Sequence, residues 1–282
     1  MTGTLPFDLA QDLVATAHAL ADAARPETLR HFRQAIAADD KTGDAAGFDP
    51  VTEADRAAER AMRAVLARRR PDDAILGEEY GATPGTSGLT WVLDPIDGTR
   101  AYICGAPTWG VLISVCGAEG PLFGLIDQPY IEERFEGGFG IARLTGPRGE
   151  MALRGRAARP LAEATVMTTF PEVGTAQDRA GFEAVSRVAR LTRYGMDCYA
   201  YALVALGQVD LVIEAGLNSY DICGPIAVIE AAGGVVTDWE GRPAHEGGRV
   251  LAAANSQIHA EALALLHERD QGPQPFIWRP AI

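Results

Sequence analysis

The sequence predicts a layered α/β protein built in two halves. In the first half, two amphipathic helical segments are followed by strand-like runs that Gly and Pro interrupt, which is typical of an antiparallel sheet. In the second half, strand-like and helical segments alternate, which is typical of helices packed against a sheet. At 282 residues and 47% hydrophobic content, the chain can bury a large core. We expect one compact unit, with an N-terminal α+β half over residues 1–150 and a C-terminal α/β half over residues 151–282.

Two helices are expected at the start of the first half. Residues 7–37 are rich in Ala and carry Leu at helical spacing, and Pro26 is expected to kink or divide this segment. A turn-rich stretch, DKTGDAAGFDP, separates it from a second helix with the sequence EADRAAERAMRAVLARRR. Thr52 fits the N-cap of that helix, Asp55 fits a capping pair with it, and Pro71 is expected to end it.

The remaining elements follow from the hydrophobic pattern and from the Gly and Pro residues between the runs. The strands expected in the first half have the sequences AILG, TWVLDPID, WGVLISVCG, PLFGLIDQP and EERFEGGFG. A soft boundary between the halves is expected near residues 145–160. Beyond it, we expect the strands ATVMTTF, VDLVIEA and VVTDW and the helices AGFEAVSRVARL, CYAYALVALGQ and ICGPIAVIEAAGG.

The composition argues against several partners and compartments. The formal net charge of −13 disfavours nucleic acid and anionic membranes as partners, because both repel an acidic surface. The four cysteines form no Cys-x-x-Cys pair, which argues against a zinc knuckle or a disulfide framework and fits a reducing compartment. The N-terminus lacks the pattern of a signal peptide, and no run approaches the roughly 18 apolar residues of a membrane span. We therefore expect a cytoplasmic protein.

Carboxylates stand at the edges of four of the expected elements. Each has an ordinary structural explanation, such as an N-cap for Asp221 or a turn at Asp97-Gly98. A cluster of these carboxylates would be unfavourable by itself, because burying an unpaired carboxylate costs several kcal/mol and two carboxylates about 4 Å apart repel each other. A compact cluster of them therefore requires cations. The acids are Asp55, Glu78, Glu79, Asp94, Asp97 and Asp221.

The chemistry of these side chains selects the kind of cation. Oxygen ligands prefer hard ions such as Mg²⁺ or Mn²⁺, which keep some of their waters and can bridge to a phosphate group. Gly98 and Thr99 directly follow the acidic segment, and they offer a close backbone approach, a hydroxyl and, if a helix starts there, free N–H groups. The residues themselves therefore point to a divalent ion that acts together with a phosphate.

These motifs resemble those of a known family. WVLDPIDGT, with GEE upstream and a Tyr-Asp followed by EAAGG downstream, is similar to the lithium-sensitive, Mg²⁺-dependent phosphatases of the inositol-monophosphatase type. DPVTEAD resembles their N-terminal motif, and the resemblance covers roughly residues 10–260. It implies an αβαβα five-layer sandwich of the sugar-phosphatase type. It also implies hydrolysis of small phosphate monoesters by a water nucleophile, lithium inhibition and a homodimer.

The resemblance also assigns roles to the acids. It implies two to three Mg²⁺ per subunit, with Mn²⁺ as a possible substitute, and Asp94 would bridge two of them. Asp55 would lie by a third, looser site and would belong to the catalytic group with Glu78 and Thr99, of which the latter two would orient the attacking water. The implied metal ligands are Glu78, Asp94, the Ile96 carbonyl, Asp97 and Asp221. The implied phosphate-binding residues are Asp97, Gly98 and Thr99.

The substrate is suggested by a segment of the second half. RYGMDCYAYALVALGQVDLVIEAG, and LIDQP before it, resemble the histidinol-phosphate phosphatases, which act in histidine biosynthesis. By this resemblance, Asp197 and Glu214 would face the leaving group together with Asp221, and Arg193 would balance charge near the phosphate. Two carboxylates suit the amine and imidazole of histidinol phosphate better than an uncharged polyol.

Several alternatives stay open at this point. GMDC replaces a more usual glycine pair and CGPIAV is atypical of the histidinol enzymes, so an inositol or broad sugar monophosphatase is the second hypothesis. Asp197 fits a helix cap, Glu214 an ordinary strand end, and Arg193 an exposed or capping position. A non-catalytic acidic protein that binds divalent ions is the hypothesis of another class. The tail QGPQPFIWRP would pack against a partner or against its own chain.

Overall fold

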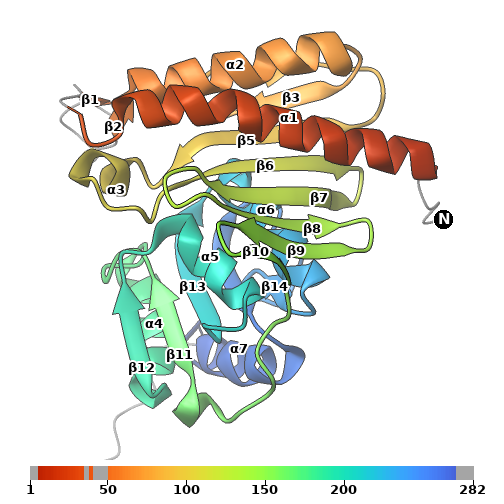
Figure 1. The fold of residues 1–282 in the computed structure, drawn as a ribbon. Coiled ribbons are helices and arrows are strands. Elements are labelled where there is room, and N and C mark those ends of the chain that lie inside the picture. The colour runs from red at the N-terminus through yellow and green to blue at the C-terminus, as the bar shows by residue number, and fades with distance from the viewer. Residues whose placement is uncertain (1–5, 35–37, 41–49, 271–282) are drawn as a thin grey trace, which may run out of the picture.

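The computed structural model describes residues 6–34, 38–40 and 50–270. Within these ranges, the two larger of three sheets and three layers of helices stack in the order α, β, α, β, α (Figure 1). The fold class expected from the sequence, a layered α/β sandwich of five layers, is confirmed. None of the described helices is both long and apolar enough to cross a lipid bilayer.

The first outer layer consists of α1 (Phe7–His31) and α2 (Glu53–Arg69), which pack against each other and against the first sheet. Their apolar faces join one core cluster with the sheet residues Trp91 and Leu93, and this burial fixes both helices on the sheet. Thr52 caps α2 and Asp55 completes the capping box, as the sequence predicts.

The first sheet has eight strands in the order β10-β9-β8-β7-β6-β5-β3-β4, and β3 and β5 are its one parallel pair. A separate antiparallel pair, β1 (Ala38–Asp40) and β2 (Pro50–Thr52), lies just before α2, and a short helix, α3 (Thr99–Cys104), follows β5. The strands of the sheet are β3 (Ala74–Gly77), β4 (Gly81–Thr83), β5 (Thr90–Asp97), β6 (Gly110–Gly117), β7 (Gly120–Gln128), β8 (Glu133–Gly138), β9 (Ile141–Gly146) and β10 (Gly149–Ala152).

The middle layer holds α5 (Asp197–Ala205) and α6 (Ser219–Ala231), both largely apolar and buried between the two sheets. α6 lies unusually close to the first sheet. A Cβ at Gly124 of β7, or at Gly137 of β8, would come within 2.5 Å of a backbone oxygen of α6. These two glycines therefore set the height of α6 above the sheet, and with it the position of the first turn of α6.

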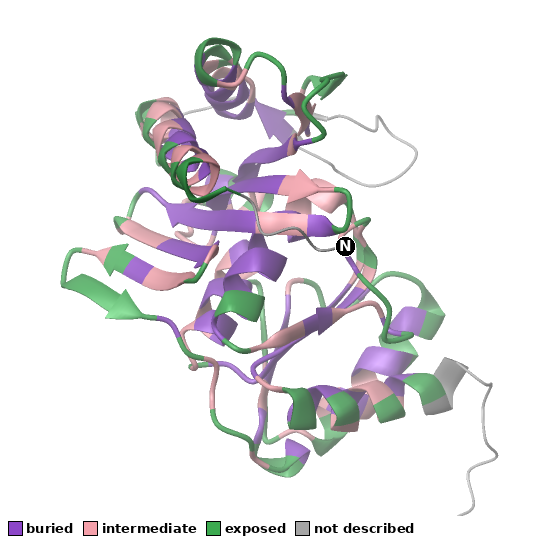
Figure 2. Cartoon of the chain, turned by 90° about the vertical axis from the view of Figure 1, so that its right-hand side faces the viewer, coloured by how far each residue is buried: buried purple, intermediate pink, exposed green. Residues whose placement is uncertain are grey.

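The second sheet has the order β12-β11-β13-β15-β14, and its outer face is covered by α4 (Ala176–Val188) and α7 (Ser256–Asp270). Figure 2 shows the buried residues gathered along the sheets and the middle helices, with exposed residues on the outward faces of the outer helices. A short 3₁₀ turn, η2 (Leu161–Glu163), precedes the sheet. The strands are β11 (Thr165–Thr168), β12 (Leu191–Tyr194), β13 (Leu211–Leu217), β14 (Val235–Thr237) and β15 (Gly248–Ala253).

The structure corrects several predicted boundaries. The expected helix over residues 7–37 ends at His31, and it continues through Pro26 instead of dividing there. Most of the expected turn DKTGDAAGFDP lies outside the described residues. The helix expected to reach Leu191 ends at Val188, because Leu191 begins the edge strand β12. The sequence reading did not identify β9, β10, β12, β15 or α7.

Candidate active site

The end of β5 brings two carboxylates to the same side of the first sheet. In a regular strand, residues three apart point to opposite faces, so Asp94 and Asp97 would diverge. The register of β5 against β6 shifts between these two residues, and Asp94 Oδ1 accepts the N–H of Ile96 at 3.0 Å. Such a bulge re-aims side chains. The two carboxylates therefore converge instead of diverging.

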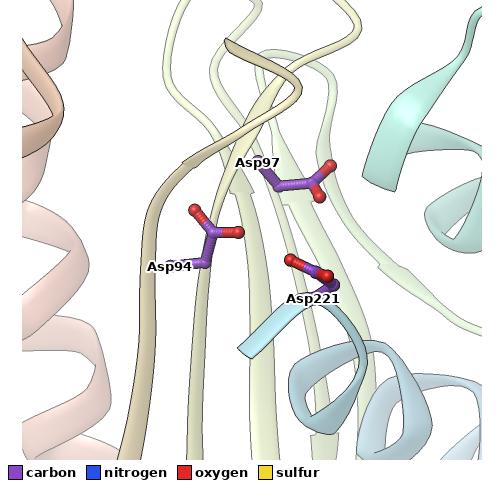
Figure 3. Close-up of side chains that lie close together, drawn as sticks. All are labelled: Asp94, Asp97 and Asp221. Atoms are coloured by element: carbon purple, nitrogen blue, oxygen red, sulfur yellow. The ribbon is translucent and has the colours of Figure 1, made fainter. Parts of the chain in front are cut away.

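A third carboxylate comes from α6. Asp221 is the third residue of this helix and not its N-cap, which corrects the capping alternative considered from the sequence; Asn218 stands at the cap position. Asp221 Oδ2 accepts the N–H of Asn218 at 2.6 Å. Three carboxylate oxygens, one each from Asp94, Asp97 and Asp221, lie within 4.8 Å of one another. Figure 3 shows these three side chains close together.

The electrostatics of this group are unfavourable without a cation. Burial raises the pKa of Asp94 well above its ordinary value, and the negative charges of Glu78, Asp97 and Asp221 raise it further. Burial also raises the pKa of Asp97, with repulsion from Asp221 and Asp197 as the next causes. A bound divalent cation would neutralise this repulsion. The all-oxygen donor set fits a hard ion such as Mg²⁺.

Glu78 and Ile96 lie beside the three aspartates. Both line the same pocket, and Glu78 is close enough to Asp94 to share a hydrogen bond with it when one of the two is protonated. The turn that carries Glu78 is held by Glu59, a buried residue of α2 whose carboxylate accepts the N–H of Glu79 at 2.7 Å. Glu79 itself is half-buried. The sequence reading did not identify Glu59.

Thr99 and Asp55 form a hydrogen-bonded pair at the edge of this cluster. The Thr99 hydroxyl lies 3.1 Å from the Ile96 carbonyl oxygen and 3.3 Å from Asp55 Oδ1. The other oxygen of Asp55 accepts the N–H of Thr52 at 2.8 Å. Burial raises the pKa of Asp55 to about 6, although the hydrogen bonds from Thr52 oppose the shift. Asp55 thus caps α2 and orients Thr99 with the same carboxylate.

Gly98 is required at its position by its conformation and by its neighbours. Its φ of 84° lies in the left-handed region, where a side chain is disfavoured. A Cβ there would also lie 2.8 Å from Asp197 Cβ, closer than packing allows. The loop between β5 and α3 can therefore lie directly against the start of α5.

The pocket next to the three aspartates has a volume of about 310 Å³ and extends toward α5 and β13. Asp197 lines it, and one of its carboxylate oxygens accepts the Thr108 hydroxyl at 2.7 Å. Asp197 is the first residue of α5, and its side chain does not cap the helix. Its φ of 46° is uncommon for a residue with a side chain, and such strain concentrates at functional sites. Burial raises its pKa.

Glu214 of β13 also lines the pocket and is buried. Its two carboxylate oxygens accept the Thr169 N–H at 2.7 Å and the Thr168 hydroxyl at 3.1 Å. Burial raises its pKa to about 7, against the effect of these hydrogen bonds. Asp197 and Glu214 therefore face the pocket together with Asp221, as expected for the leaving-group end. Their contact with a substrate stays a prediction.

Arg193 is the predicted site residue that the structure separates from the rest. It is exposed on the edge strand β12 and does not line the pocket. Among the described residues that do line it, the cationic side chain is Arg100, whose guanidinium lies 4.8 Å from the ring centroid of Phe170. A positive charge is therefore present at the pocket on Arg100 and not on Arg193. The position of Arg100 directly after DPIDGT was the signal that could have identified it.

The chain is similar to a known family and to known proteins. A model of the inositol monophosphatase family matches residues 9–271. A bifunctional phosphatase from Arabidopsis thaliana, IMPL2, chloroplastic, is 39% identical over 263 residues, which are 89% of this chain and 74% of that protein. A histidinol-phosphatase from Streptomyces coelicolor is 36% identical over 260 residues, which are 90% of this chain and 96% of that protein.

The fold is similar to that of solved structures. The structure of an inositol monophosphatase from Zymomonas mobilis matches with a TM-score of 0.81 and 36% sequence identity. The match covers 91% of this chain and 98% of that one. Sequence and fold therefore agree on the same relatives.

Proposed function

The chain belongs to the inositol monophosphatase family and is a phosphatase of phosphoric monoesters, and we propose that its substrate is L-histidinol phosphate, hydrolysed with Mg²⁺. The observation that carries the proposal is the pair Asp197 and Glu214, whose carboxylates line the part of the pocket next to the three metal-side aspartates. Histidinol-phosphatases from three bacteria, at 32 to 36% identity, support the same substrate.

The residues present fit a magnesium site. Glu78, Asp94, the Ile96 carbonyl, Asp97 and Asp221 would hold two ions, and Asp55 would lie by a third. When bound, the ions would neutralise the phosphate oxygens and activate a water. Mn²⁺ prefers the same oxygen ligands and would serve as a substitute.

The chain's own groups would position the reactants. Thr99 Oγ1 and the Glu78 carboxylate would orient the attacking water, and Asp55 would hold the Thr99 hydroxyl in place from the start of α2. The backbone at Gly98 and Thr99 would receive the phosphate. No covalent bond to a protein side chain is needed, because water is the nucleophile and the alcohol leaves.

Recognition of the leaving group rests on charge. The amine of histidinol phosphate is cationic near neutral pH, and its imidazole becomes cationic on protonation. Glu214, with its pKa raised to about 7, and Asp197 would gain a counter-charge from such a leaving group. An uncharged polyol offers hydroxyl groups alone, so it would leave the buried acids without a counter-ion.

A second candidate is an inositol or other polyol phosphate. It is supported by the inositol monophosphatases among the relatives, one of them from Mycobacterium tuberculosis at 33% identity over 270 residues. The metal site and the mechanism would be the same, so the difference lies in the leaving-group end. A homodimer stays a prediction of the resemblance, and a cytoplasmic location stays a prediction of the composition.

The test is a comparison of kcat/KM for L-histidinol phosphate and myo-inositol 1-phosphate in Mg²⁺. We expect histidinol phosphate to be preferred by at least about tenfold, which corresponds to the roughly 1.4 kcal/mol that one charged hydrogen bond contributes. Equal values, or a preference for the inositol ester, would show that the acids at the leaving-group end do not select the substrate as proposed.

A further inference from the structure

Tyr201 of α5 has a buried hydroxyl group that forms no hydrogen bond with the described residues. The residue is 4% exposed and lines the pocket. Its hydroxyl oxygen is fully buried and has no hydrogen-bond partner among the residues that the structure describes. Buried polar atoms nearly always have a partner, so such a group in a pocket indicates a partner that comes from outside the chain.

The position of Tyr201 in the helix relates it to the leaving-group end. It follows Asp197 by four residues, and both residues line the pocket. Among the charged groups that raise the pKa of Tyr201, Glu214 has the largest effect, followed by Asp97 and Asp221. Both Glu214 oxygens already accept hydrogen bonds from Thr168 and Thr169.

Tyr201 differs in chemistry from the acids around it. Burial raises the pKa of Tyr201, and the neighbouring negative charges raise it further, so the phenol keeps its proton near neutral pH. An ionised carboxylate is an acceptor alone, whereas a tyrosine hydroxyl can donate. The acids at this end can therefore accept hydrogen bonds from the N–H groups of a ligand, and Tyr201 can donate one to an acceptor atom of the ligand.

Resting on the proposed function, we propose that the Tyr201 hydroxyl donates a hydrogen bond to the unprotonated ring nitrogen of the leaving group and so selects an imidazole-bearing ester. A neutral imidazole has one donor and one acceptor nitrogen. Asp197 or Glu214 accepts from the N–H, and Tyr201 donates to the other nitrogen. Tyr201 is thus a specificity-determining residue and takes no part in activating water.

The variant Tyr201→Phe removes the hydroxyl and keeps the ring. We expect kcat/KM for L-histidinol phosphate to fall about three- to tenfold, mainly through KM, as is typical of one neutral hydrogen bond. For 2-aminoethyl phosphate, which has the amine but no ring, kcat/KM should stay within about twofold. The melting temperature of the free protein should be unchanged or higher, because the hydroxyl that is removed makes no bond in it.

Tyr199→Phe is the matched control on the same helix. The Tyr199 hydroxyl donates to Glu133 Oε2 at 2.5 Å, and the residue does not line the pocket. This variant should lower the melting temperature and leave kcat/KM for both esters within about twofold. If the Tyr201 hydroxyl had only a structural role, Tyr201→Phe would likewise lower the melting temperature and leave kcat/KM for both esters within about twofold.

The two proposals fail in different ways. If wild-type protein shows no preference for L-histidinol phosphate over myo-inositol 1-phosphate, the proposed substrate is wrong. If the preference is present and Tyr201→Phe leaves kcat/KM for histidinol phosphate unchanged, or lowers it equally for 2-aminoethyl phosphate, the role of Tyr201 is wrong. A lower melting temperature without a change in KM would likewise assign Tyr201 a structural role.

Discussion

The two ends of the pocket hold acids for different physical reasons. At the metal end, the pKa values of Asp94 and Asp97 are raised by burial and then by repulsion from neighbouring carboxylates. At the leaving-group end, burial raises the pKa values of Asp197 and Glu214, and hydrogen bonds from threonine residues oppose the shift. After burial, repulsion between carboxylates is therefore the main influence on the pKa values at the metal end, whereas hydrogen bonds from protein donors are the main influence at the leaving-group end.

The difference indicates what each end can bind. Mutual repulsion among acids is relieved by a dication, which interacts with several carboxylates at once. Acids that already accept hydrogen bonds from the protein keep a fixed orientation, and this suits selection of a particular organic cation. Under the proposed function, the same residue type would provide the metal site at one end and specificity at the other.

The largest expected effect is that of Asp94→Asn. This change should lower kcat by at least about a thousandfold, about 4 kcal/mol in the activation free energy, because it weakens both metal positions. In the absence of Mg²⁺ the variant should be at least as stable as wild type, because a repelling charge is removed. Phosphate release and thermal unfolding with and without Mg²⁺ measure both effects.

Asp127→Asn is the control for Asp94→Asn within the same sheet. Asp127 is fully buried but paired, with Arg134 Nε at 2.7 Å and Arg25 Nη2 at 3.1 Å from its Oδ1. Loss of its charge should lower the free energy of unfolding by on the order of 3 kcal/mol. Unchanged activity in Asp94→Asn, or a loss of stability as large as that of the control, would contradict the metal-end assignment.

The second expected effect is on stability as a function of pH. Asp55 and Glu214 have folded-state pKa values of about 6 and about 7, above their ordinary values, and those of Asp94 and Asp97 are also raised. The folded, metal-free protein therefore binds more protons than the unfolded chain. Its free energy of unfolding should fall as pH rises from about 4 to about 7, by up to about 1.4 kcal/mol per pH unit for each group.

Saturating Mg²⁺ separates the contributions of the two ends. Bound cations favour the ionised carboxylates at the metal end, so the decrease in stability with pH should become smaller, and the stabilisation by Mg²⁺ should increase with pH. Urea unfolding at about pH 5 and about pH 7.5, with chelator and with Mg²⁺, measures this. The same slope under both conditions would mean that the acids of the metal end do not bind the ion.

The smallest of these effects is that of Asp197→Asn. The change should raise KM for L-histidinol phosphate by roughly tenfold, because it removes a charged hydrogen-bond acceptor. KM for myo-inositol 1-phosphate should change by no more than about twofold, and that substrate is the internal control. Equal increases for both esters would place Asp197 at the phosphate or metal end instead.

The features predicted accurately were those that depend on local sequence. The capping box of Thr52 and Asp55, the strand ending in Asp94 and Asp97, and the apolar helix after Asp221 all appear in the structure, although this helix begins at Ser219 and so includes Asp221. These features depend on hydrogen bonds and periodicity within a few residues. The enzyme class is confirmed by the family match, so the alternative of a non-catalytic ion-binding protein has no support.

The errors arose where distant parts of the chain decide the outcome. Pro26 does not divide α1, because the packing of α1 against α2 and the first sheet outweighs a local helix-breaking residue. Arg193 was expected in the site, but pairing with β11 places it on an exposed edge strand. Glu59 and Tyr201 lie within ordinary helical patterns, and nothing in those patterns marks them as polar groups at the site.

The sequence alone determined the chemistry available: acids at element ends, a Gly-Thr step after two of these acids, and the order of motifs along the chain. The tertiary structure decided which of these groups meet. The bulge in β5 turns Asp94 and Asp97 to one side, and the glycines beneath α6 set the position of Asp221. Convergence of this kind depends on packing between segments far apart in sequence, and local propensity carries no information about such packing.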